Sequence, residues 1–323
     1  TVERDELKEC LSKLQNKSGD YIANVQNLLN RIGDNSNNIS NRDDIYIIPG
    51  KTHKGTIPVI NDCNSFMTEL GYNLGESGVS DEYSFDLAEY LYAIFAGGMC
   101  PLLIGYSARS VADAISYTIS GESATVLMMQ LGFSDYSKLI STVDNSIGKV
   151  ISIEGAVENI SESVYIPLIK NSTDKFLIFS MESISRMEIL PDFILNYILP
   201  IDLDLIIDYK KPDELYYSKT DSSIFNTNIG QDQCRRIFND LGRLDEFITL
   251  SNACKLRLSK IIGIIDNIGV NRGMYSALLF TLNGLCTSHE SRERLKNFIN
   301  IQTFNPQTLR KIMVKLEDEL INA

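Results

Sequence analysis

Residues 101–116 hold the residues whose spacing most closely suggests chemistry: an apolar run that passes through one glycine into a helical pattern. Leu102, Leu103 and Ile104 are typical of a short strand buried on both faces, and Gly105 ends the run. The helix that follows would offer free N–H groups and a positive dipole end. This arrangement predicts a turn of the kind that binds phosphate.

The turn lacks the side chains that bind and hydrolyse a nucleotide. Phosphate-binding loops of NTPases follow the pattern Gly-x-x-x-x-Gly-Lys-Ser/Thr. With Gly105 as the first glycine, Ser110, Val111 and Ala112 stand where the second glycine, the lysine and the hydroxyl belong. That lysine contacts the β- and γ-phosphates and that hydroxyl binds Mg²⁺, so the turn keeps its shape without its chemistry. The guanidinium of Arg109 could replace the positive charge of the missing lysine; alternatively, the Arg109 side chain faces solvent.

Five apolar runs alternate with helical patterns through the middle of the chain. This order predicts an α/β fold with a five-stranded parallel sheet, in which the strand 101–105 is central and helices cover both faces. The expected strands are 101–105, 124–129, 149–154, 175–180 and 203–207. The expected helices are one that follows Gly105 and carries apolar residues from 111 to 119, and those at 136–143, 162–169 and 191–199.

The flanking regions differ from this core. Residues 45–48 and 56–60 predict a β-hairpin, followed by a glycine-containing loop at 71–82. Residues 1–32 carry apolar side chains three to four positions apart, which predicts a helix that docks on a partner chain. The expected divisions are an N-terminal helical segment and linker (1–44), a hairpin and loop (45–83), an α/β core (84–230) and an all-α C-terminal lid domain (231–323).

This order resembles the AAA+ P-loop ATPases, in particular the MoxR and McrB-like branch, over roughly residues 84–300. In that family the third strand ends in Asp-Glu, which holds Mg²⁺ and activates water, and the fourth ends in a polar sensor. Here Glu154 and Gly155 end the third strand, and Ser180 or Ser183 takes the sensor position. The resemblance implies a vestigial nucleotide site made of Gly105, Arg109, Ser110, Glu154 and Ser180.

The replaced residues argue against catalysis. Loss of the lysine alone removes a charge-assisted contact worth about 1.5–3 kcal/mol, and Gly155 cannot activate water. We therefore expect no catalytic residues and no cofactor, with ATP or GTP binding as the alternative. Whether the chain is an enzyme stays open, and the degenerate motifs favour a pseudo-ATPase.

Metal binding also finds little support. The six cysteines are scattered and only two histidines are present. Asp202, Asp204 and Asp208 would share one face of the strand 203–207, which indicates either a metal site or, more commonly, the polar side of an edge strand. We expect no metal.

Charge divides the chain into an acidic body and a basic end. The net charge is −12, yet residues 251–323 carry ten Lys and Arg against six Asp and Glu. Such an end suits a nucleic-acid backbone or a neighbouring subunit, and solvated helix faces are the alternative. The expected contacts are Arg292, Arg294, Lys296, Arg310, Lys311 and Lys315.

These observations favour a catalytically silent AAA+-like assembly or regulatory subunit of a larger intracellular complex. The alternatives are a nucleic-acid-contacting subunit of a DNA-processing or antiviral defence system, and a divergent active NTPase. No apolar run reaches the length of a membrane helix, and the first residues, Thr-Val-Glu-Arg-Asp-Glu, do not resemble a secretion signal. We expect a cytoplasmic protein with protein partners or self-assembly and without membrane contact.

Overall fold

The computed structural model describes residues 45–295 with interruptions. The segments 1–44 and 296–323 lie outside the described residues, and so do the six basic contact positions. The divisions proposed at 83 and 230 stay predictions. The interruptions are 54, 130–132, 134, 156–163, 173, 185–186, 188–191, 205, 209–213, 247, 249, 270–271 and 286–294.

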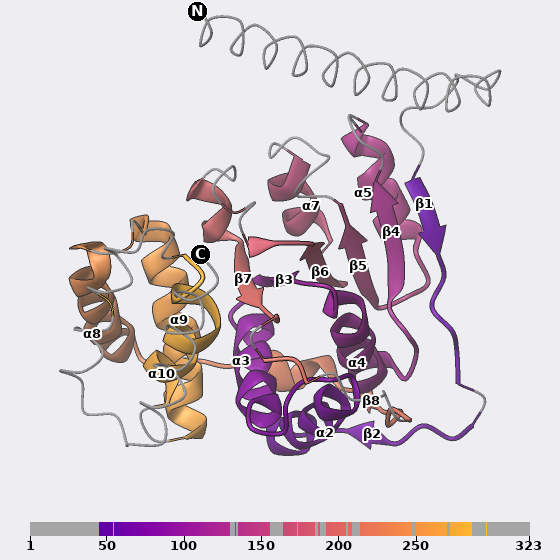
Figure 1. Ribbon diagram of the computed structural model, residues 1–323, viewed down its shortest axis with the longest axis horizontal. Coiled ribbons are helices and arrows are strands. Elements are labelled where there is room, and N and C mark those ends of the chain that lie inside the picture. The colour runs from indigo at the N-terminus through magenta and orange to yellow at the C-terminus, as the bar shows by residue number, and fades with distance from the viewer. Residues whose placement is uncertain are drawn as a thin grey trace, which may run out of the picture. The chain divides into compact units, whose positions relative to one another are not determined.

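A six-stranded sheet in the order β1-β4-β5-β6-β3-β7 forms the centre of the described chain (Figure 1). Five of its strands run parallel, as the sequence predicts, and β1 pairs antiparallel with β4. The strands are β1 (Ile45–Ile48), β3 (Cys100–Ile104), β4 (Thr125–Met129), β5 (Val150–Glu154), β6 (Phe176–Met181) and β7 (Ile198–Asp202).

The strand β3 lies inside the sheet. All five of its residues are buried, and it pairs in parallel with β6 on one side and with β7 on the other. Its register places Leu103 beside Ser180 of β6 and Ile201 of β7. Only β7 lies beyond β3, so β3 is the second strand from the edge of the sheet. The predicted central position is therefore confirmed only in that β3 has a neighbouring strand on each side.

Helices cover both faces of the sheet (Figure 1). The chain leaves β3 through α4 and crosses two strand positions to reach β4, then returns through α5 and α7. Figure 1 shows α2, α3 and α4 on one face and α5 and α7 on the other. Their bounds are α2 (Cys63–Glu76), α3 (Ser84–Ala96), α4 (Ala108–Ser120), α5 (Tyr136–Asn145) and α7 (Tyr165–Asn171).

Two predictions near the start of the described chain are wrong. No hairpin joins residues 45–48 to 56–60, because β1 pairs with β4 and β2 (Val59–Ile60) pairs in parallel with β8 (Lys219–Thr220). The expected loop at 71–82 begins inside α2. The Asp62 side chain caps this helix by accepting a hydrogen bond from the Ser65 N–H at 2.8 Å.

The fifth parallel strand lies earlier than expected. Residues 192–196 form a 3₁₀ helix, η3 (Asp192–Asn196), and β7 occupies positions that the sequence assigned to the end of a helix. Of the predicted strand 203–207, Leu203, Asp204 and Ile206 lie in turn or irregular structure, and Ile207 forms only an isolated antiparallel bridge with Val79. The carboxylates of Asp202, Asp204 and Asp208 therefore do not alternate along one strand.

The C-terminal helices pack against α3, and buried polar groups join them to the core. The Tyr90 hydroxyl on α3 lies 2.6 Å from the Thr281 hydroxyl. Asp86 binds the Arg272 guanidinium and accepts a hydrogen bond from the Tyr275 hydroxyl at 3.0 Å. The elements of this region are η4 (Ser222–Phe225), α8 (Gln231–Gly242), η5 (Arg243–Glu246), α9 (Asn252–Ile268), α10 (Gly273–Ala277) and the π-helical η6 (Leu278–Leu282). Among the described helices, none combines the length and the apolar character that a membrane crossing needs.

Candidate functional site

Four of the five predicted site residues meet at the carboxyl end of the parallel strands. Gly105, Arg109, Glu154 and Ser180 line one cavity of about 340 Å³. The sheet register explains this, since Glu154 at the end of β5 lies beside Ser180 of β6. We call this space the carboxyl-edge cavity. Its other lining residues are Tyr106, Ala108, Met128, Met129, Gly155, Met181 and Glu182.

The fifth predicted residue, Ser110, lies elsewhere. Its side chain is exposed on α4 and does not line the carboxyl-edge cavity. The next two positions are buried, with 0% of Val111 and 1% of Ala112 exposed. In this register the position of the lysine therefore lies in the apolar core, where a charged side chain would lose its hydration.

The Gly105 turn is already in contact with a carboxylate of the same chain. Gly105 has a φ of 116°, which favours glycine, and a Cβ built there would collide with the Asp204 carboxylate. The Tyr106 N–H donates a hydrogen bond to Asp204. Burial and the neighbouring Asp202 raise the pKa of Asp204, and this hydrogen bond opposes the increase. A donor of the turn is thus satisfied by an internal anion.

Glu154 adds further negative charge to the carboxyl-edge cavity. Its Oε1 atom is buried and has no hydrogen-bond partner. Burial raises the pKa of Glu154, with a contribution from Asp113, while the Arg109 guanidinium opposes the increase. Among the described residues that line the cavity, Glu154 and Glu182 are acidic and Arg109 is the one cation. The electrostatic field therefore disfavours a triphosphate.

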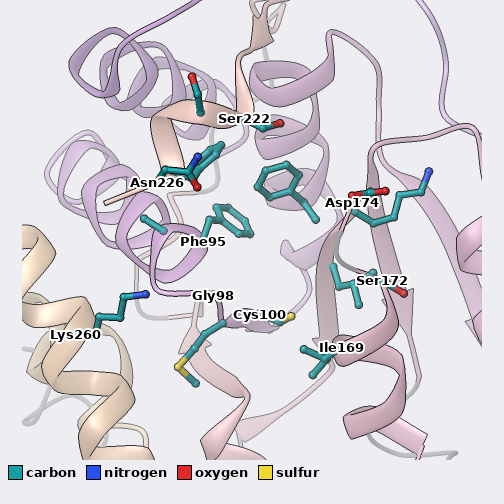
Figure 2. A pocket seen from close by; sticks show the side chains of 16 residues that line it. Phe95, Gly98, Cys100, Ile169, Ser172, Asp174, Ser222, Asn226 and Lys260 are labelled. Atoms are coloured by element: carbon teal, nitrogen blue, oxygen red, sulfur yellow. The ribbon is translucent and has the colours of Figure 1, made fainter. Parts of the chain in front are cut away.

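A second cavity lies at the opposite end of the strands, where β3 and β6 begin (Figure 2). It measures about 720 Å³ and we call it the amino-edge cavity. Cys100 and Phe176 line it from the sheet, Phe95 from α3 and Lys260 from α9. The remaining lining residues are Ala96, Gly98, Met99, Ile169, Ser172, Asp174, Lys175, Leu177, Ser222, Ser223, Phe225 and Asn226.

Thiol and metal chemistry find no support in the described part of the chain. Its four cysteines are free, and burial raises the pKa of Cys100 and of Cys254 to about 12, so both stay neutral thiols near pH 7. Within the same residues, no three His, Cys, Asp or Glu side chains are grouped as metal ligands would be. The ring of His53 stacks on Tyr217 with centroids 4.0 Å apart.

Sequence patterns located the turn and Glu154 but missed Asp204, Asp174 and Lys260. Asp204 was assigned to a strand, and no local motif connects it with Gly105, which lies about one hundred residues earlier. Asp174 and Lys260 come from separate elements that meet only in the folded chain. Spacing within one segment could not reveal these groups.

The comparisons with known proteins returned no match: no family model fits the chain, and no curated protein or solved structure is significantly similar to it.

Proposed function

We propose that the chain is a catalytically silent module of the AAA+-like P-loop type, which works by assembly in a larger intracellular complex. Two properties support this proposal. The arrangement of the parallel strands provides the crevice in which such proteins hold phosphate, and the residues in that crevice oppose nucleotide binding.

The topology supports the P-loop part of the proposal. In open α/β sheets, ligands bind outside the carboxyl ends of the strands, where the path of the chain changes direction. From β3 the chain runs past β6 and β5 to β4, while β7 lies on the other side of β3. The Gly105 turn is therefore at the switch point, and α4 begins directly after it.

The contact between Asp204 and the Gly105 turn carries the silent part of the proposal. A phosphate at this turn would have to displace or neutralise a carboxylate that already accepts the Tyr106 N–H. Neither Val111 nor Ala112 supplies compensating chemistry, since both are apolar and buried. A phosphate placed beside the Asp204 carboxylate would be repelled by it, and this repulsion would make the binding free energy less favourable. The repulsion would offset the hydrogen bonds that the backbone N–H groups of the turn would donate to the phosphate.

An exposed aromatic face supports assembly. Tyr72, Phe85 and Tyr216 are 55%, 43% and 57% exposed. The Tyr72 ring lies 5.3 Å from Phe85 and 6.3 Å from Tyr216, and we call the three the aromatic face. Buried Asn73 holds the main chain of Tyr216, because its side chain accepts the Tyr216 N–H at 2.7 Å and donates to the Tyr216 carbonyl at 3.0 Å. Rigid exposed tyrosines are typical of protein interfaces.

Charge indicates what the partner brings to the aromatic face. Residues 55–108 contain seven Asp and Glu and no Lys or Arg. We therefore expect the partner surface to present Lys or Arg, whether it belongs to a second copy or to another protein. A nucleic-acid partner would have to bind through the basic end of the chain instead.

The experiment measures turnover and assembly on the full chain. We expect phosphate release from ATP and GTP with Mg²⁺ at background, and no change in Glu154→Gln. We also expect a concentration-dependent assembly in sedimentation velocity that Tyr72→Ala with Tyr216→Ala weakens. Tyr136→Ala, which removes a ring that is 53% exposed elsewhere, is the matched control.

Two results would contradict this function. Phosphate release that Glu154→Gln abolishes would establish a divergent NTPase. A chain that remains monomeric at every concentration and binds DNA or RNA in a salt-dependent manner would favour the nucleic-acid alternative.

A further inference from the structure

The amino-edge cavity has the size and the location of a small-molecule site. Its volume of about 720 Å³ falls within the range of ligand pockets, and it lies where the sheet meets α9 of the C-terminal helices. It is at the opposite edge of the sheet from the Gly105 turn, so nothing in the following argument depends on the proposed function.

Aromatic side chains form an apolar wall of this cavity. The ring of Phe176 lies 5.3 Å from that of Phe95 and 5.1 Å from that of Phe225. Phe225 is buried and also packs edge-on against Phe66 at 5.3 Å, which anchors the wall in the core. Phe95 and Phe176 are half-buried and line the cavity. This wall suits an apolar body.

Two opposite charges approach the cavity from different walls. Figure 2 shows Lys260 extending from α9 on one side and Asp174 on the other, with Phe95 between them. Within the described chain neither side chain has an ion pair or a hydrogen bond. Lys175 also lines the cavity, but its Nζ donates to the carbonyls of Ser146 and Gly148 at 2.6 and 3.1 Å. Lys260 is therefore the ammonium that remains for a ligand.

Neutral polar groups complete the site. Lys149 donates to the Ser222 hydroxyl at 2.9 Å, which leaves the Ser222 proton available to an acceptor in the cavity. Asn226 lies on the same side of the cavity as Ser222 (Figure 2), and Ser223 also lines the cavity. Asp174 follows the C-terminus of α7, where the carbonyl dipoles favour a positive charge. The wall that carries Lys260 thus suits an anion and the wall that carries Asp174 suits a cation.

We propose that the amino-edge cavity binds a small zwitterion, an amino acid or short peptide with an apolar side chain. Its carboxylate contacts Lys260, its ammonium contacts Asp174, and its apolar body lies against Phe95 and Phe176. A molecule with only one of the two charges leaves the other wall unpaired and binds more weakly.

The test uses the full chain and a defined set of probes. Phenylalanine, glycylphenylalanine and aminohexanoate are zwitterions whose charges are separated by different lengths. N-acetylphenylalanine keeps only the carboxylate, and phenylalaninamide keeps only the ammonium. Saturation-transfer NMR detects binding, and titration calorimetry gives each Kd. We expect one zwitterion to bind about tenfold more tightly than both of its capped analogues.

Variants assign the two ends of the ligand. Lys260→Gln should weaken the zwitterion about tenfold and leave phenylalaninamide unchanged, whereas Asp174→Asn should leave N-acetylphenylalanine unchanged. The exchange variant Lys260→Asp with Asp174→Lys should restore binding of the zwitterion in the reverse orientation. Lys219→Gln and Asp144→Asn remove exposed charges outside the cavity and serve as controls. Melting temperatures verify that each variant folds.

Three results would overturn the proposal. If the capped analogues bind as tightly as the zwitterions, the cavity does not recognise the two charges of a zwitterion together. Equal losses in the control variants would show that only net charge matters. Each probe is tested at millimolar concentration and at 10-fold excess over the chain, because a Kd of about 1 mM is the weakest affinity worth assigning to a site. If no probe shows saturable binding under these conditions, this ligand class is excluded.

Discussion

The two ends of the parallel sheet contrast in how their polar groups are satisfied. At the carboxyl edge, a carboxylate of the chain itself binds the turn that a phosphate would need, and among the described lining residues one cation, Arg109, stands against two acids. At the amino edge, Lys260 and Asp174 line one cavity across an aromatic wall, and neither has a partner within the residues that the structure describes. Polar groups at the carboxyl edge are thus held by other parts of the chain, whereas the two charges at the amino edge remain available to a ligand under the proposal made above.

The aromatic residues at the two edges should differ most in stability. Phe225 is buried in the ring cluster of the amino edge, whereas Tyr106 is 93% exposed at the carboxyl edge. Phe225→Ala should destabilise the fold by about 3–5 kcal/mol, since it removes a buried ring, and Tyr106→Ala should cost less than about 0.5 kcal/mol. Urea denaturation measures both. If the two variants lose similar free energies of unfolding, the Tyr106 ring is packed in the folded protein, and the contrast between the two edges is wrong.

Two glycines with positive φ provide a matched pair. A Cβ at Gly105 meets the Asp204 carboxylate, whereas a Cβ at Gly98, near the amino edge, meets nothing within 4 Å. Gly98→Ala should cost only backbone strain of about 1 kcal/mol, and Gly105→Ala should cost about 2–3 kcal/mol. Adding Asp204→Ala to Gly105→Ala should recover the difference in a double-mutant cycle. If the two changes are additive, Asp204 does not occupy the turn.

The pH dependence of stability tests Glu154. Burial raises its pKa in the folded state, so the native protein holds this proton more tightly than the unfolded chain does. Its contribution is therefore lost as the pH rises from the unfolded pKa through the folded pKa. Glu154→Gln should flatten this decline and stabilise the protein at pH 7 by about 0.5 kcal/mol, a small value because solvent screens the group. If the free energy of unfolding falls more steeply with pH in the variant than in the unaltered chain, the pKa of Glu154 is not raised by folding.

The sequence predicted the strands that are buried on both faces and misplaced those at the edges. Continuous apolar runs mark β3, β4, β5 and β6, because both of their faces are covered. The edge strand β1 pairs with β4, which lies about eighty residues later in the chain. The local sequence pattern does not reveal so distant a partner, and it predicted pairing with residues 56–60 instead. Pro200 lies within β7, where an edge strand tolerates the missing N–H.

Glycine misled the prediction of α2. Gly71 and Gly75 suggested a loop, yet both lie inside the helix. A Cβ at Gly71 would collide with the Phe85 ring, so this glycine permits the close approach of α2 and α3. In the candidate site, the register of β5 and β6 brings Glu154 beside Ser180, while the positions of Asp204, Asp174 and Lys260 depend on contacts between distant segments.

Equilibrium dialysis of radiolabelled ATP against the full chain, with saturating Mg²⁺, tests the central claim most directly. We predict no saturable binding at concentrations up to about 1 mM, a limit that corresponds to a binding free energy of about −4 kcal/mol. Asp204→Ala serves as the comparison, because it removes the carboxylate that occupies the turn. Saturable binding of ATP by the unaltered chain with a micromolar Kd, lost in Gly105→Ala, would show that the carboxyl edge is an open nucleotide site and would contradict this account.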